Sequence, residues 1–105
     1  MTTVVFAEHT REDGKHVCMI QAAGHATGSQ DMCSAVSALL WTLYAWAKNA
    51  EVDANEDEML MESGHAVIKF TGDERAAEVY KAFLIGFLQL QQHDPQHIKV
   101  IEAGK

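Results

Sequence analysis

This chain has little capacity for covalent cross-linking, because Cys18 and Cys33 are its only two cysteines. At most one disulfide can form, which is too few for the cysteine-stapled scaffolds of small secreted proteins. A reducing compartment therefore fits the composition better than an oxidising one. His16 and Cys18 share a strand face, but paired motifs such as Cys-x-x-Cys are absent and a tetrahedral site needs about four ligands. We therefore expect no metal and no cofactor.

Long apolar runs are absent as well. No stretch reaches the roughly 18 consecutive apolar residues that a membrane span requires. The segment from Met1 to Phe6 has neither the basic region nor the hydrophobic region of a signal peptide. We therefore expect a cytoplasmic protein that does not bind membranes.

Positive charge is scarce. Eight Lys and Arg residues stand against 15 Asp and Glu residues, giving a formal net charge of −7 with the histidines neutral. Contacts with phosphates need clustered Lys and Arg, so this balance argues against direct binding of nucleic acid. An acidic protein is better suited to a neutral or basic partner.

What is present is an ordinary globular composition, with 48% hydrophobic and 22% charged residues in 105. This length predicts one domain over residues 1–105. Such a domain buries only a small core, and oligomerisation is a plausible supplement to it.

The pattern of apolar residues and turn signals predicts seven elements in the order β-β-α-β-β-α-β. Asp13-Gly14 and Ser63-Gly64 are hairpin turns, and Asp31 and Asp73 are the expected N-caps of the two helices. The expected strands cover residues 2–7, 15–23, 58–62, 65–71 and 96–102, and the expected helices cover residues 32–49 and 74–93. This order predicts an α+β fold in which two helices cover one side of a mostly antiparallel sheet.

The first expected helix is apolar on almost every side. Ala35, Leu39, Leu43 and Trp46 lie near one face, while Trp41 lies toward another. A helix of this kind is buried almost all round. We therefore expect the sheet on one side of it and the second helix or another subunit on the other, which predicts a homodimer.

Cys33 is the first candidate for chemistry. It lies in the first turn of the expected helix, where the positive end of the helix dipole favours a thiolate. The backbone N–H groups there can also hold an oxyanion. The alternative is that Cys33 is a small buried apolar residue, which is common for a free cysteine.

His25 is the candidate base, because its imidazole can accept the proton of a thiol across a short loop. The chain has five other histidines, and only proximity in sequence to Cys33 favours His25. Asp31 can orient His25 as a third member, although its residue type favours helix capping. Ser37 lies one turn after Cys33 on the same helix face, as a hydrogen-bonding neighbour or as a small packing residue.

Two motifs resemble those of the ribosomal-processing cysteine protease family, Prp. They are Gly24-His25-Ala26 and the segment that runs from Asp31 through Cys33 and Ser37 to Leu39. The family carries Gly-His-Ala, a glycine-containing loop, and a segment with Asp, Cys and Ser-Ala that opens a helix. The order of elements and the length fit as well. The segment between Ala26 and Cys33 is several residues shorter than the family's loop, as in a diverged or phage-borne relative.

The resemblance implies a homodimeric, cytoplasmic bacterial protease that removes the N-terminal extension of ribosomal protein L27. It places the nucleophile at Cys33 and the base at His25, with Asp31 and Ser37 at less clearly catalytic positions. The leading hypothesis is therefore a cysteine endopeptidase acting on that extension or a similar peptide. The rival hypothesis is a non-catalytic dimeric binding module for a ribosomal protein or peptide.

Overall fold

The computed structural model describes residues 1–25, 30–50 and 52–103. The elements follow the predicted order, with two short additions, β3 and a 3₁₀ turn η1, inside the acidic connection after the first helix. The bounds are β1 Thr2–Thr10, β2 His16–Ala23, α1 Gln30–Asn49, β3 Asp53–Ala54, η1 Glu56–Glu58, β4 Leu60–Glu62, β5 His65–Gly72, α2 Glu74–His93 and β6 Ile98–Ala103.

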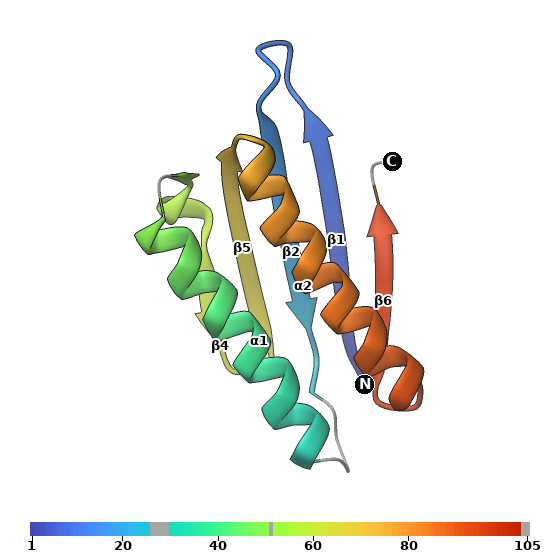
Figure 1. The fold of residues 1–105 in the computed structure, drawn as a ribbon. Coiled ribbons are helices and arrows are strands. Elements are labelled where there is room, and N and C mark those ends of the chain that lie inside the picture. The colour runs from blue at the N-terminus through green and yellow to red at the C-terminus, as the bar shows by residue number, and fades with distance from the viewer. Residues whose placement is uncertain (26–29, 51, 104–105) are drawn as a thin grey trace.

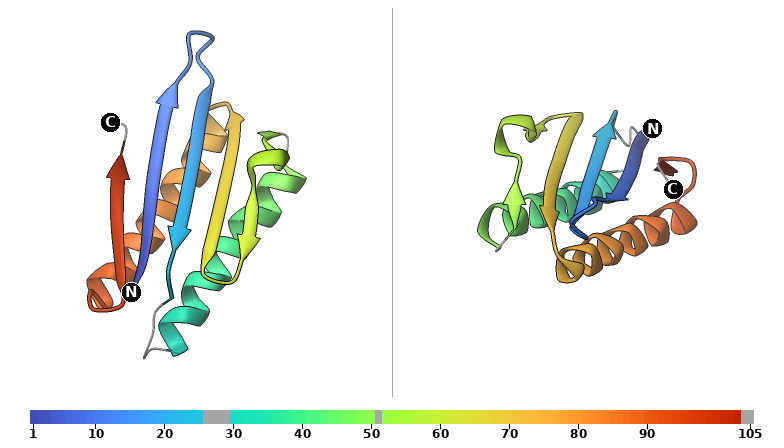
Figure 2. Two further views of the ribbon diagram at one scale, coloured as in Figure 1. Left: turned by 180° about the vertical axis from the view of Figure 1, so that it is seen from behind. Right: turned by 90° about the horizontal axis from the view of Figure 1, so that it is seen from above.

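The strands form one sheet in the order β3-β5-β2-β1-β6, and β4 also pairs with β5 (Figure 1). Every pair is antiparallel except β1 with β6, which is parallel. Both helices lie on the same face of this sheet (Figure 2). The predicted two-layer α+β architecture is therefore confirmed.

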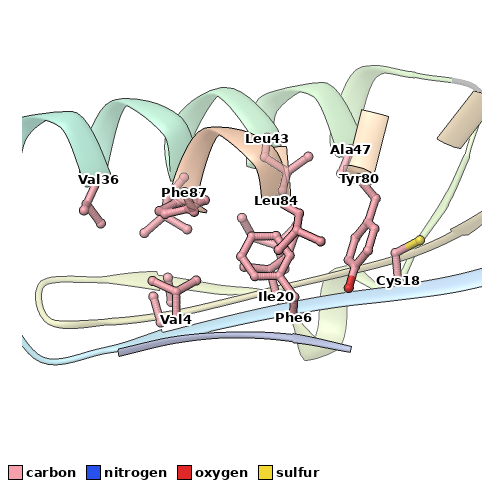
Figure 3. Close-up of a cluster of buried hydrophobic side chains, with 14 of the residues drawn as sticks. Val4, Phe6, Cys18, Ile20, Val36, Leu43, Ala47, Tyr80, Leu84 and Phe87 are labelled. Carbon is pink, nitrogen blue, oxygen red and sulfur yellow. The ribbon is translucent and has the colours of Figure 1, made fainter. Parts of the chain in front are cut away.

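The buried face of the sheet follows from the alternation of side chains along the strands. Phe6 of β1, Ile20 of β2 and Ile68 of β5 are paired across the three central strands, and each is at most 1% exposed. From α2, the rings of Tyr80 and Phe87 meet Phe6 edge-on, with centroids 5.5 and 5.6 Å away. These side chains join the two layers in one core (Figure 3).

The prediction that α1 is buried almost all round is wrong for the single chain. Its buried residues form one stripe that faces the sheet and α2, namely Met32, Val36, Leu40, Leu43 and Ala47. Trp41, on another side, is 55% exposed because no described element covers it. The homodimer stays a prediction. No helix in the described ranges is long and apolar enough to cross a membrane.

The two expected N-caps have different outcomes. The Asp73 carboxylate accepts hydrogen bonds from the backbone N–H groups of Arg75 and Ala76, so this cap is confirmed. Asp31 lies inside the first turn of α1, which begins one residue earlier at Gln30. The prediction of Asp31 as the cap is therefore wrong. The expected loop before this helix lies partly outside the described residues.

Cys18 lies in the core, as its place in the middle of β2 predicted. Its side chain is fully buried beside Tyr80 (Figure 3). Burial raises the pKa of the Cys18 thiol from 9.0 to about 12, and the negative charge of Glu8, its partner on β1, adds to the effect. Cys18 therefore stays a neutral thiol at any physiological pH.

This burial predicts a loss of stability in alkali. Between pH 9.0 and about 12 the unfolded chain releases the Cys18 proton while the folded chain retains it. The free energy of unfolding should then fall with rising pH, by up to about 1.4 kcal/mol per pH unit. Urea denaturation at several pH values should give a shallower fall for Cys18→Ala than for the wild type.

Tyr80 is the matched control, because burial raises its pKa above its ordinary value as well. In the Tyr80→Phe variant the contribution of Cys18 should remain. Equal slopes for the wild type and Cys18→Ala would contradict the assignment to Cys18.

Candidate active site

A cavity of about 340 Å³ lies at the end of the sheet where β2 ends and α1 begins. Its walls come from α1, from residues 61–66 of β4 and β5, and from Thr2 and His25. Cys33 and Ser37 both belong to the α1 wall. The cavity therefore brings together three of the four candidate site residues, which are His25, Cys33 and Ser37.

Gly24 sets the path of the chain into this cavity. Its φ of +90° belongs to the region that glycine adopts without steric cost, and a Cβ there would collide with the backbone oxygen of Met1. The backbone N–H of Gly24 donates to the backbone oxygen of Gly64 at 2.9 Å. This bond ties the end of β2 to the turn between β4 and β5. His25 therefore leaves the sheet from a fixed point.

The imidazole of His25 lies against Gly64. A Cβ built on Gly64 would stand 2.5 Å from the Nε2 atom of His25, which is far inside van der Waals contact. Gly64 has a φ of +78° and closes the tight turn between Glu62 and His65. The absence of a side chain at Gly64 thus serves both the turn and the place of the His25 ring.

Cys33 is the fourth residue of α1 and is partly buried. Part of its side chain packs against the core, and part lines the cavity. The first turn of a helix is its positive end, and backbone N–H groups there lack partners within the helix. Ser37 follows one turn later on the same wall. This end of the cavity therefore combines a thiol, a hydroxyl and a helix N-terminus.

Among the other histidines, only His65 also lines the cavity. His16 lies at the far end of β2, where its ring is 3.5 Å from the Glu8 carboxylate. His97 pairs with Asp94 at 2.8 Å beyond the end of α2. Asp31 is exposed and is not among the lining residues, so its role as orienting group stays a prediction.

Sequence reasoning missed the wall that β4 and β5 provide. Glu62 and His65 face each other across the Ser63-Gly64 turn, and both line the cavity. The turn itself was predicted, but not the pairing of β5 with β2, which places Ala23 opposite His65. Trp41, expected to be buried, lines the cavity as well. The described residues hold no group of three His, Cys, Asp or Glu side chains that could bind a metal.

The contact between Gly64 and His25 gives a testable prediction. Gly64→Ala should displace the His25 ring and also strain the turn by about 1–2 kcal/mol. The ring displacement is measured as a change in the NMR chemical shifts of the His25 imidazole. Gly14→Ala is the matched control, because Gly14 has a φ of +84° and nothing within 4 Å of its Cβ position. Both variants should lose similar stability, and unchanged His25 shifts in Gly64→Ala would contradict the contact.

The fold is shared with solved structures of proteases. The ribosomal processing protease Prp from S. aureus, in complex with a covalently linked product peptide, superposes with a TM-score of 0.74 at 18% identity. The alignment covers 97% of this chain and 99% of that one. The same protease with a substrate peptide gives a TM-score of 0.72 at 15% identity, with the same coverage of both chains.

SMU.848 from Streptococcus mutans has the fold too, with a TM-score of 0.68 at 22% identity over 100% of this chain and 99% of that one. No family model and no curated protein matches the sequence. This chain therefore has the Prp fold over nearly its whole length.

Proposed function

We propose that this protein is a cysteine endopeptidase in which Cys33 is the nucleophile and His25 is the general base. The observation that carries the proposal is that these two side chains, one just after β2 and one in the first turn of α1, line one cavity. The cavity belongs to a fold whose S. aureus example has been solved with a covalently linked product peptide. Cysteine and histidine at one site are the usual equipment of thiol-based acyl transfer.

In the first half of the reaction, the Sγ atom of Cys33 attacks the carbonyl carbon of the scissile peptide bond. His25 takes the thiol proton, and the carbonyl oxygen becomes an oxyanion. Backbone N–H groups at the start of α1 stabilise this negative charge. The tetrahedral intermediate then collapses and the C–N bond breaks. His25 delivers its proton to the leaving amine, and the acyl group stays on Cys33 as a thioester.

In the second half, water enters the place of the departed amine. His25 takes a proton from this water as its oxygen attacks the thioester carbon. The C–S bond then breaks, the acid product leaves, and the proton returns to the sulfur of Cys33. We propose that Ser37, which lines the same wall, hydrogen-bonds near the sulfur or the substrate. Asp31 is proposed only as a supporting residue.

The proposed substrate is the N-terminal extension of ribosomal protein L27 or a similar peptide. The support is the resemblance of the motifs around His25 and Cys33, together with a fold shared with a ribosomal processing protease. We further propose that the protein acts as a homodimer in the cytoplasm. Two free cysteines, Cys18 and Cys33, are compatible with a reducing compartment.

Alkylation tests the nucleophile directly. Iodoacetamide at neutral pH, followed by mass mapping, should label Cys33 quickly and spare Cys18, which is fully buried. His25→Ala should slow the labelling of Cys33, because the base that takes its proton is gone. His93→Ala is the matched control, since His93 is exposed and lies outside the cavity. Equal, slow labelling of both cysteines, without any effect of His25→Ala, would favour the non-catalytic binding module.

Cleavage tests the reaction. Incubation of the protein with L27 that carries its extension should release the extension as a peptide detected by mass spectrometry. Cys33→Ala should lower the rate at least about a thousandfold, as expected for loss of a nucleophile. Cys18→Ala should leave the rate within about twofold, because the Cys18 thiol lies outside the cavity. Undiminished cleavage by Cys33→Ala would exclude Cys33 as nucleophile.

A further inference from the structure

The cavity lined by Cys33 and His25 has an acidic side chain but no permanently positive one among its described lining residues. Glu62 is the one acidic residue among its described lining residues, and these include no lysine and no arginine. The two imidazoles, of His25 and His65, complete the set of titratable side chains beside the Cys33 thiol. A ligand that brings a positive charge into this cavity therefore meets a carboxylate and no fixed cation.

The Glu62 carboxylate is available for such a ligand. Glu62 is the last residue of β4, its side chain is exposed, and it forms no ion pair or side-chain hydrogen bond within the described residues. Glu58, a few residues earlier, differs in this respect. Its carboxylate is 3.0 Å from the ammonium of Lys69 and also accepts a hydrogen bond from Asn55. Of these two carboxylates, that of Glu62, at the cavity, is therefore the one without a partner among the described residues.

Trp41 faces the same cavity from α1. Its side chain is 55% exposed, which is high for the largest aromatic residue. The indole meets the ring of Tyr44 edge-on at 5.6 Å, and the nearby cation of its own helix, Lys48, lies over Tyr44. Trp offers the best face for a cation among the aromatic side chains. An exposed indole and an unpaired carboxylate on one cavity together suit the long side chain of a lysine or an arginine.

We propose that Trp41 and Glu62 form a subsite for a basic side chain of the peptide substrate. This inference rests on the proposed function, because it names a specificity determinant of the same cavity. The net charge of −7 favours the approach of a basic peptide from solution. The face of the indole attracts the charged end of the basic side chain, and the carboxylate pairs with the same charge.

The spacing of Cys33 and Trp41 along α1 sets the distance between the scissile bond and this subsite. Trp41 lies eight residues after Cys33 on the same wall, which corresponds to about 12 Å along the helix axis. An extended peptide covers that distance in about four residues. The basic side chain therefore belongs about three or four residues away from the scissile bond.

Binding of synthetic peptides tests the subsite without relying on catalysis. The probe is a set of fluorescein-labelled decapeptides of Ala, Ser and Phe in which one Lys occupies each position in turn. Each has a partner with norleucine in place of Lys, which retains the stem and removes the charge. Fluorescence anisotropy with the Cys33→Ala variant should show one Lys position that binds about threefold to tenfold more tightly than its norleucine partner.

Glu62→Gln in the same background should bring that affinity ratio to about one. Glu12→Gln is the matched control, because it removes the same charge at the exposed hairpin turn beyond the other end of β2. Trp41→Leu should lower the ratio as well. Ile85→Ala should leave it unchanged, since Ile85 is 59% exposed but lies outside the cavity.

The proposal is overturned if no Lys peptide binds more tightly than its partner, or if the ratio survives both Glu62→Gln and Trp41→Leu. Wild-type protein with the same peptides and with extended L27 separates this failure from that of the proposed function. If L27 is cleaved but the Lys and norleucine peptides bind equally, the subsite is excluded and the protease function stands. A ratio that depends on Glu62 and Trp41, with no cleavage of any substrate, removes the protease and leaves a site for basic peptides.

Discussion

The antiparallel pairing of β2 with β5 determines how the end of the sheet contributes to the cavity. It places Ala23, at the end of β2, opposite His65, at the start of β5. The hydrogen bond from Gly24 to Gly64 follows from this register, and so does the position of the His25 ring over Gly64. A slip of one residue would turn the side chains of a strand to the opposite face and carry the whole buried set out of the core. The register of this strand pair therefore determines both the packing of the core and the shape of the cavity.

The thiols of Cys18 and Cys33 lie in different surroundings. Cys18 is surrounded by the core and by the charge of Glu8, so its thiol holds its proton. Cys33 lies where the core meets the cavity, with one side of its side chain packed and the other open. Reactivity of a thiol depends on access and on the ease of ionisation. The fold separates an inert sulfur from an accessible one within a chain of only 105 residues.

Local signals in the sequence were sufficient for much of the fold. Asp73 and the Ser63-Gly64 turn mark their elements through side-chain and backbone preferences that act over a few residues. The same reasoning placed Cys18 in the core and His25 and Cys33 in one region. It failed for Asp31, because α1 begins one residue earlier, at Gln30. It also failed for Trp41, whose exposure depends on what the rest of the fold leaves uncovered.

The cavity wall that β4 and β5 contribute could not be predicted from local signals in the sequence, for a related reason. Glu62 and His65 become neighbours of Cys33 only through the pairing of strands that are distant in sequence, and single-residue preferences carry no information on that pairing. The candidate catalytic residues could thus be named from their types, their proximity in sequence and the motifs that resemble a known family. The residues that shape the space around them could not, because their role exists only in the assembled sheet.

The parallel strand β6 links the cavity to the other end of the chain. Thr2 lines the cavity, and its backbone N–H donates to the backbone oxygen of His97, just before β6. Closing a contact between residues so distant in sequence carries a cost in chain entropy. A chain still emerging from the ribosome therefore contains the Cys33 thiol and the His25 imidazole before the part of the cavity wall at Thr2 is complete. The wall that Thr2 provides is therefore complete only after the last strand has been synthesised.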